Sequence, residues 1–161
     1  MGGSKLAAMR LKDTILFRVS LGNSREQVLA ALGEPQRETW IADDNKTNLL
    51  YSPKPTAKTG LFGPPPGGAI VRIDSNGFVD HIRARGSMRL GFIEVNVQDS
   101  EETVLERLSD LRPFTKSPGY VSYCDDFMPL LKSDRPVTLA INFRDGIVQQ
   151  FELEFGPKFP D

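Results

Sequence analysis

The chain has 161 residues, which is enough for one domain or two very small ones. Its 39% hydrophobic and 25% charged residues are ordinary for a soluble globular protein. Lysine and arginine number 20 against 21 aspartates and glutamates, and this balance argues against nucleic acid or an anionic membrane as the main partner, because both require concentrated positive charge.

The N-terminal ten residues contain no apolar segment of the kind that a signal peptide needs, and no cysteine follows that could be lipidated. We therefore expect neither a leader nor a membrane span. The only cysteine, Cys124, cannot form an intramolecular disulfide, which favours a reducing compartment. The sequence predicts a cytoplasmic protein, or a periplasmic one if a leader precedes this chain and is removed.

In the first half of the chain, residues 14–19 are expected to form a strand and residues 24–32 a helix. Ser24 and Gln27 make a capping box, in which each side chain accepts a hydrogen bond from a backbone N–H of the first turn. Residues 38–42 and 47–52 are then expected to pair as strands. The turn between them carries the adjacent carboxylates of Asp43 and Asp44.

Residues 54–68 form a long loop around Leu61-Phe62-Gly63-Pro64-Pro65-Pro66. Three prolines cannot enter a sheet ladder, so we expect this loop, and Phe62 within it, to be exposed. A loop of this length is either functional or a disordered insertion, and both alternatives stay open.

A hairpin follows, formed by residues 69–74 and 78–82 around Asn76-Gly77, a pair that tolerates the positive φ angles of a tight turn. His81 is expected on the same strand face as Val79.

The second half repeats the first. Residues 100–108 align with residues 24–32 at an offset of 76, with identical Ser, Glu, Val, Leu and Leu. A strand at 91–97 precedes this second helix. A strand at 119–124 follows it. A hairpin comes next, formed by residues 137–143 and 147–155 around Asp145-Gly146. We predict an α+β fold of two tandem units, each a helix packed on an antiparallel β-sheet, forming one continuous or concave sheet. The first repeat spans residues 1–86 and the second spans residues 87–161.

The sequence carries no motif of a known catalytic class. His81 is the only histidine, and a general base needs a nucleophile and an orienting carboxylate nearby. A surface strand histidine is the favoured interpretation, and an enzyme that uses His81 with an aspartate pair is the alternative. One histidine and one cysteine cannot build a conventional zinc site. We therefore expect no enzyme activity, no cofactor and no metal.

Aromatic and acidic residues are the candidates for binding a partner protein. Aromatic side chains are frequent anchors of protein interfaces, and an acidic contact face suits a basic target. The predicted partner-binding residues are Trp40, Asp43, Asp44, Tyr51, Phe62, Pro64, Pro65, Tyr120, Tyr123, Asp125 and Asp126.

The stretch from Gly22 to Pro35 resembles the G-x-[ST]-x-x-x-V-x-x-x-L-G-x-P signature of the SmpA/OmlA lipoprotein family. Two such units in tandem resemble the β-lactamase inhibitor protein family. That resemblance implies a concave sheet surface with loops that insert into a target enzyme. We therefore predict an inhibitor or immunity protein that neutralises a partner toxin or enzyme by occlusion. The alternative is an SmpA/OmlA-type envelope scaffold module that lacks its leader.

Overall fold

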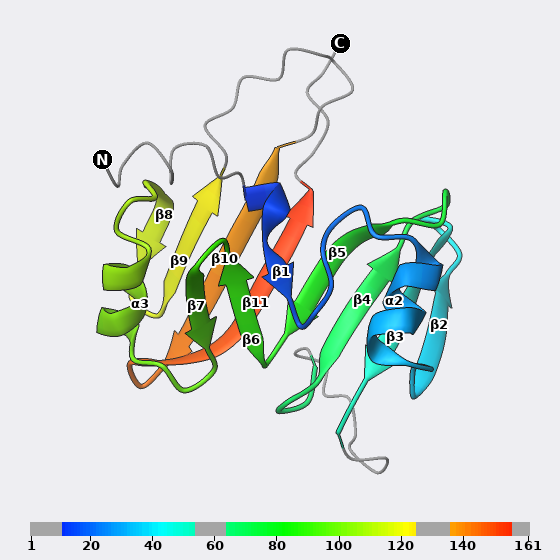
Figure 1. The fold of residues 1–161 in the computed structure, drawn as a ribbon, viewed down its shortest axis with the longest axis horizontal. Helices are drawn as coiled ribbons and strands as arrows, with labels where there is room; N and C mark the ends of the chain where they lie inside the picture. Colours follow the sequence, from blue (N-terminus) through cyan, green and yellow to red (C-terminus); the bar gives the residue numbers. More distant parts are fainter. Residues whose placement is uncertain (1–10, 54–63, 125–135, 156–161) are drawn as a thin grey trace.

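A computed structural model describes residues 11–53, 64–124 and 136–155. Its main layer is an eight-stranded antiparallel sheet (Figure 1), in the order β2-β3-β4-β5-β11-β10-β9-β8. The strands are β2 (Arg37–Ile41), β3 (Lys46–Tyr51), β4 (Ala69–Ile73), β5 (Val79–Ala84), β8 (Pro113–Ser117), β9 (Tyr120–Cys124), β10 (Val137–Arg144) and β11 (Ile147–Phe155).

A second layer covers one face of this sheet and lies in front of it in Figure 1. It contains a three-stranded sheet in the order β1-β6-β7 and two short helices. The elements are η1 (Leu11–Asp13), β1 (Ile15–Leu16), α2 (Arg25–Leu32), β6 (Ser87–Leu90), β7 (Ile93–Asn96) and α3 (Glu101–Arg107). Neither helix in the described ranges is long and apolar enough to cross a membrane.

The predicted fold class is wrong, because the chain is mostly β and does not form two tandem helix-on-sheet units. The helices have only eight and seven residues, and each buries a single side chain completely, Val28 in α2 and Val104 in α3. Helices this short cannot each cover a sheet, so the β1-β6-β7 sheet shares that role. Strand β5 pairs directly with β11, which joins both halves of the chain in one sheet. The expected boundary after residue 86 falls between β5 and β6 and stays a prediction.

The predicted capping box at the start of α2 is confirmed. The Ser24 hydroxyl accepts a hydrogen bond from the Gln27 N–H at 3.2 Å, and the Gln27 side-chain oxygen accepts one from the Ser24 N–H at 2.8 Å. Ser100 caps α3 by accepting from the Thr103 N–H at 3.1 Å. Because the local sequence determines a capping box, its position could be predicted without knowledge of the fold.

The first strand is shorter than predicted, since only Ile15 and Leu16 of residues 14–19 are in a ladder. Phe17 and Arg18 have φ angles of +55° and +65°, which end the extended conformation. Both hairpin turns are present as predicted, with Gly77 at φ +89°. Asp145 in the second turn has φ +55° and the following Gly146 has +77°.

The two faces of the large sheet differ in chemistry. Residues paired across the strands on the covered face are all buried and almost all apolar. They are Leu49, Val71, Ile82, Leu153, Leu139 and Tyr123. The next row, on the opposite face, is half-buried and largely polar, and it consists of Asn48, Arg72, His81, Glu154, Thr138 and Cys124. We refer to this second face as the polar face.

A β-bulge between β4 and β5 overturns the expected orientation of His81. The register runs from Arg72↔His81 to Ile73↔Val79, so one extra residue, Asp80, is inserted in β5. Val79 is therefore fully buried on the covered face, whereas Asp80 and His81 both contact side chains of the polar face. The sequence prediction assumed an unbroken period of two, which a bulge interrupts.

Candidate functional site

Three of the predicted partner-binding residues lie together on the β2–β3 hairpin. Trp40 is on β2, an edge strand of the large sheet, and its side chain is 63% exposed. Its indole N–H donates to Asn45 Oδ1 at 3.3 Å, which holds the ring beside the turn. Asp43 and Asp44 are exposed in that turn. We refer to Trp40, Asp43, Asp44 and Asn45 as the acidic hairpin.

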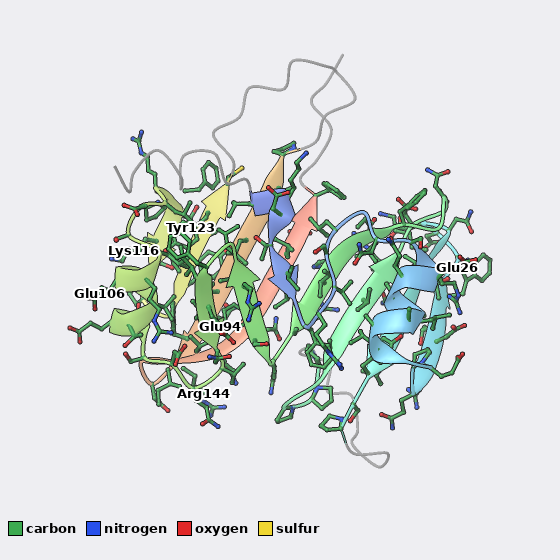
Figure 2. The ribbon with its side chains drawn as sticks, in the orientation of Figure 1. Glu26, Glu94, Glu106, Lys116, Tyr123 and Arg144 are labelled. Atoms are coloured by element: carbon green, nitrogen blue, oxygen red, sulfur yellow. The ribbon has the colours of Figure 1, made fainter. Side chains whose placement is uncertain are left out.

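Tyr51 and Tyr123 occupy the core instead. They are 7% and 2% exposed, so they offer almost no surface to a partner. The Tyr51 hydroxyl donates to the carbonyl oxygen of Gly33 at 3.0 Å and thereby ties β3 to the end of α2. Burial raises the pKa of Tyr51, and the charge of Glu34 adds to this. Burial also raises the pKa of Tyr123, which lies on β9 on the covered face of the large sheet (Figure 2).

The remaining candidates are dispersed. Tyr120 is half-buried at the start of β9, far from β2 in the strand order. Pro64 and Pro65 are buried, so the expectation of an exposed loop is wrong for them. The backbone groups of Gly67 and Gly68 form hydrogen bonds of 3.1 and 2.9 Å with the backbone of Arg85, which directly follows β5. These bonds hold the segment against the sheet. Phe62, Asp125 and Asp126 lie outside the described residues.

A cavity of about 380 Å³ opens beside Tyr51. Its other walls come from the end of α2 and from the turn after β1, including Phe17 and Arg18 with their positive φ angles. Residues held in sparsely populated backbone conformations are often found near functional sites. Tyr51 lines this cavity although it is only 7% exposed, and its hydroxyl is bound to the backbone of Gly33.

The sequence did not reveal an ion-pair cluster on the polar face. The Asp80 carboxylate, 2% exposed, accepts hydrogen bonds from Lys46 Nζ and Arg72 Nε, both at 2.7 Å. Burial acts to raise the pKa of Asp80, but the hydrogen bonds and charges of Arg72 and Lys46 outweigh it, so the pKa lies below its usual value. This aspartate is therefore ionised and holds three adjacent strands together.

His81 lies next to this group and contacts two carboxylates of β11. Its Nε2 atom is 2.7 Å from Glu152 Oε1 and 3.8 Å from Glu154 Oε2. The hydrogen bond with His81 is the main cause that lowers the pKa of Glu152, against the opposing effect of burial. Glu152 and Glu154 are two residues apart on β11 and therefore lie on one face of the strand. Only the pairing of β5 with β11 shows that His81 faces them.

The enzyme alternative required His81 and an aspartate pair in one pocket. The carboxylates beside His81 are those of Glu152 and Glu154. Asp43 and Asp44 lie in the β2–β3 turn, while His81 is on β5, separated from β2 by two strands. The described part of the chain therefore does not assemble the predicted constellation.

The fold and these two groups define a mostly β protein with an exposed aromatic and acidic hairpin on one edge and an ionic cluster at the centre of its large sheet. No protein-family model matches the chain, and no curated protein matches it. A solved structure of a DUF4309 family protein (YjgB) from Bacillus subtilis is similar, with a TM-score of 0.42 and 17% identity. The match covers 83% of this chain and 79% of that chain, and a likeness this weak carries no argument about function.

Proposed function

We propose that this protein binds a partner protein through the acidic hairpin and neutralises it by occlusion, as an immunity protein does for a toxin. The observation that supports this most is Trp40, a tryptophan with 63% exposure on an edge strand. Tryptophan is enriched among the few residues that dominate interface energies, because its large ring buries much area with little loss of entropy.

Two further features of the hairpin support a protein partner. An edge strand presents backbone N–H and C=O groups that an incoming chain can pair with. Asp43 and Asp44 add two negative charges beside Trp40, which favours a partner with a basic surface and speeds its association. The proposed function involves binding and no catalysis by this chain. We place it in the cytoplasm, in agreement with its single, free cysteine.

The test compares two exposed aromatics on opposite edges of the large sheet. Phe114 on β8 is 74% exposed and serves as the matched control for Trp40. Tagged wild-type, Trp40→Ala and Phe114→Ala chains are expressed in the native host, and the proteins bound to each are quantified. Loss of a central aromatic anchor costs about 2 kcal/mol or more, which is about 30-fold in Kd, so Trp40→Ala should lose a partner that the other two retain.

The second stage tests neutralisation. A strain that lacks the chain should become sensitive to the captured partner, and wild type or Phe114→Ala should restore resistance while Trp40→Ala should not. Unchanged sensitivity of the deletion strain, or full activity of Trp40→Ala, would contradict the proposal. A deletion that instead weakens the cell envelope would favour the SmpA/OmlA-type scaffold alternative.

A further inference from the structure

We propose that His81, Glu152 and Glu154 form a binding site for a borderline divalent transition-metal ion of the Zn²⁺ class. These are one imidazole and two carboxylates from the neighbouring strands β5 and β11, and their ligand atoms all lie within 4.8 Å of one another. The inference concerns a site separate from the acidic hairpin and does not depend on the proposed function.

The ligand distances fit such an ion. Zinc bonds to imidazole nitrogen and carboxylate oxygen are about 2.0–2.2 Å long, which places two ligands of one tetrahedral ion about 3.4 Å apart. The separations from His81 Nε2 are 2.7 Å to Glu152 and 3.8 Å to Glu154, one shorter and one longer than that spacing. Small side-chain rotations would bring all three atoms to the required positions. The ion takes the place of the proton that lies between His81 Nε2 and Glu152. That proton moves to His81 Nδ1 or is released to solvent.

The backbone that carries these ligands is firmly placed. Strands β5 and β11 are the fourth and fifth of eight, so each is paired on both sides, with β4 and β10 as the outer neighbours. His81 and Glu154 are direct partners in the register. Glu152 is two residues away on the same face of β11. Sites built on paired strands hold their ligands more accurately than sites on loops.

The side chains are accessible enough to receive an ion and sheltered enough to hold it. The exposed fractions are 15% for His81, 28% for Glu152 and 41% for Glu154. Two carboxylates neutralise a divalent charge, and the imidazole favours zinc, nickel or copper over magnesium or calcium. Three protein ligands leave one tetrahedral position for water.

The neighbouring cations determine which variants test the site. Arg72 is already bound to the Asp80 carboxylate at 2.7 Å. Arg83 lies directly opposite Glu152 in the register and opposes an incoming cation. Arg83→Gln should therefore tighten zinc binding, by about 3-fold or more, because it removes a like charge next to the ion.

The experiment titrates chelator-stripped full chain with ZnCl₂ in a calorimeter. Wild type should bind one ion per chain. Glu154→Gln should weaken binding by at least about 10-fold, since loss of an outer-shell contact alone commonly costs this much. Within the described residues, the ion pair of Glu154 is its 3.8 Å contact with His81. The variant therefore keeps the His81–Glu152 hydrogen bond and should fold. Glu94→Gln is the matched control, because Glu94 lies on β7 in the small sheet, which forms the front layer in Figure 2.

Cobalt then identifies the ligands. Co²⁺ at the proposed site should give a tetrahedral d–d spectrum without a sulfur charge-transfer band. Cys124 lies on the polar face two strands from Glu154, so a sulfur band that Cys124→Ser abolishes would assign the metal to the thiol and overturn the proposal. Absence of saturable zinc binding, equal affinity in Glu154→Gln, or tighter binding of MgCl₂ than of ZnCl₂ would overturn it as well.

Discussion

Replacement of Asp80 by asparagine tests whether the buried ionic cluster stabilises the sheet. The substitution keeps the shape of the side chain but leaves one acceptor oxygen for two cations, whose donors lie 2.7 Å away. A hydrogen bond to a charged group contributes about 1.5–3 kcal/mol when its partner is buried. The Lys46 and Arg72 side chains are 25% and 26% exposed and regain some hydration. We therefore expect the free energy of unfolding to fall by about 2–3 kcal/mol.

Urea unfolding at pH 7 measures this loss, and thermal melting should show a decrease of about 4–12 °C for a chain of this size. Asp74→Asn is the matched control. Asp74 Oδ1 accepts from the N–H groups of Asn76 and Phe78 at 2.9 and 3.0 Å, and an amide oxygen can accept both bonds. The control should lose less than about 1 kcal/mol.

The pH dependence gives a second test. Because the pKa of Asp80 is lowered in the folded chain, its contribution is complete above the unfolded value of about 3.9 and is lost as the pH falls through the still lower folded value. The difference in the free energy of unfolding between wild type and Asp80→Asn should stay constant from about pH 7 to pH 5. It should shrink below about pH 4. The lowered pKa of Glu152 also makes stability depend on pH, but Glu152 is common to both chains, so its contribution cancels in the difference. A gap below about 0.5 kcal/mol at pH 7, or one that does not shrink in acid, would refute this reasoning.

Three further substitutions test local features, each by urea unfolding at pH 7. Ser24→Ala removes the hydroxyl that caps α2, so the free energy of unfolding should fall by about 1 kcal/mol. An unchanged free energy of unfolding would show that the capping box does not stabilise the chain. Gly68→Ala would place a Cβ 2.5 Å from the carbonyl oxygen of Tyr51, so it should destabilise the fold by about 1–3 kcal/mol. An unchanged free energy of unfolding would mean that the backbone at the end of β3 shifts at little cost. Arg18→Gly should stabilise by up to about 1 kcal/mol because its φ is +65°. A destabilised variant would contradict this reasoning and show that the Arg18 side chain contributes more than its backbone conformation costs.

The parts of the fold that could be predicted are those that short sequences determine. The cap at Ser24 depends on four consecutive residues, and the turn at Asp145-Gly146 on two, so both were correct. The strand pair β2 and β3 was also predicted nearly to its ends. The assembly of these elements was predicted wrongly, because apolar periodicity shows which face of a strand is buried but not which strand edges pair.

The candidate site residues could be predicted only where they are close in sequence. Trp40, Asp43 and Asp44 could be chosen from the sequence because they lie on one hairpin, where neighbours in sequence are neighbours in space. His81 and Glu152 are separated by 71 residues and meet only through the β5–β11 pairing. Counting histidines and cysteines therefore predicted no metal site, since the carboxylates that could complete one come from a distant strand.

Neither the apolar pattern nor the charge pattern at the β5–β11 junction defines the register by itself. A slip of one residue between these strands would move Leu153 off the covered face, so the apolar pattern forbids it. A slip of two residues keeps Leu153 and Phe151 buried and is not forbidden by that pattern. Such a slip would also leave opposite charges facing each other. One direction sets Glu152 opposite Arg85 and Glu154 opposite Arg83, and the other sets Glu152 opposite His81. Directly opposed charge pairs contribute about 0.2–1 kcal/mol each, so these pairs alone do not distinguish the observed register from its neighbours. The observed register is the one that sets His81 opposite Glu154 and, at the same time, 2.7 Å from Glu152.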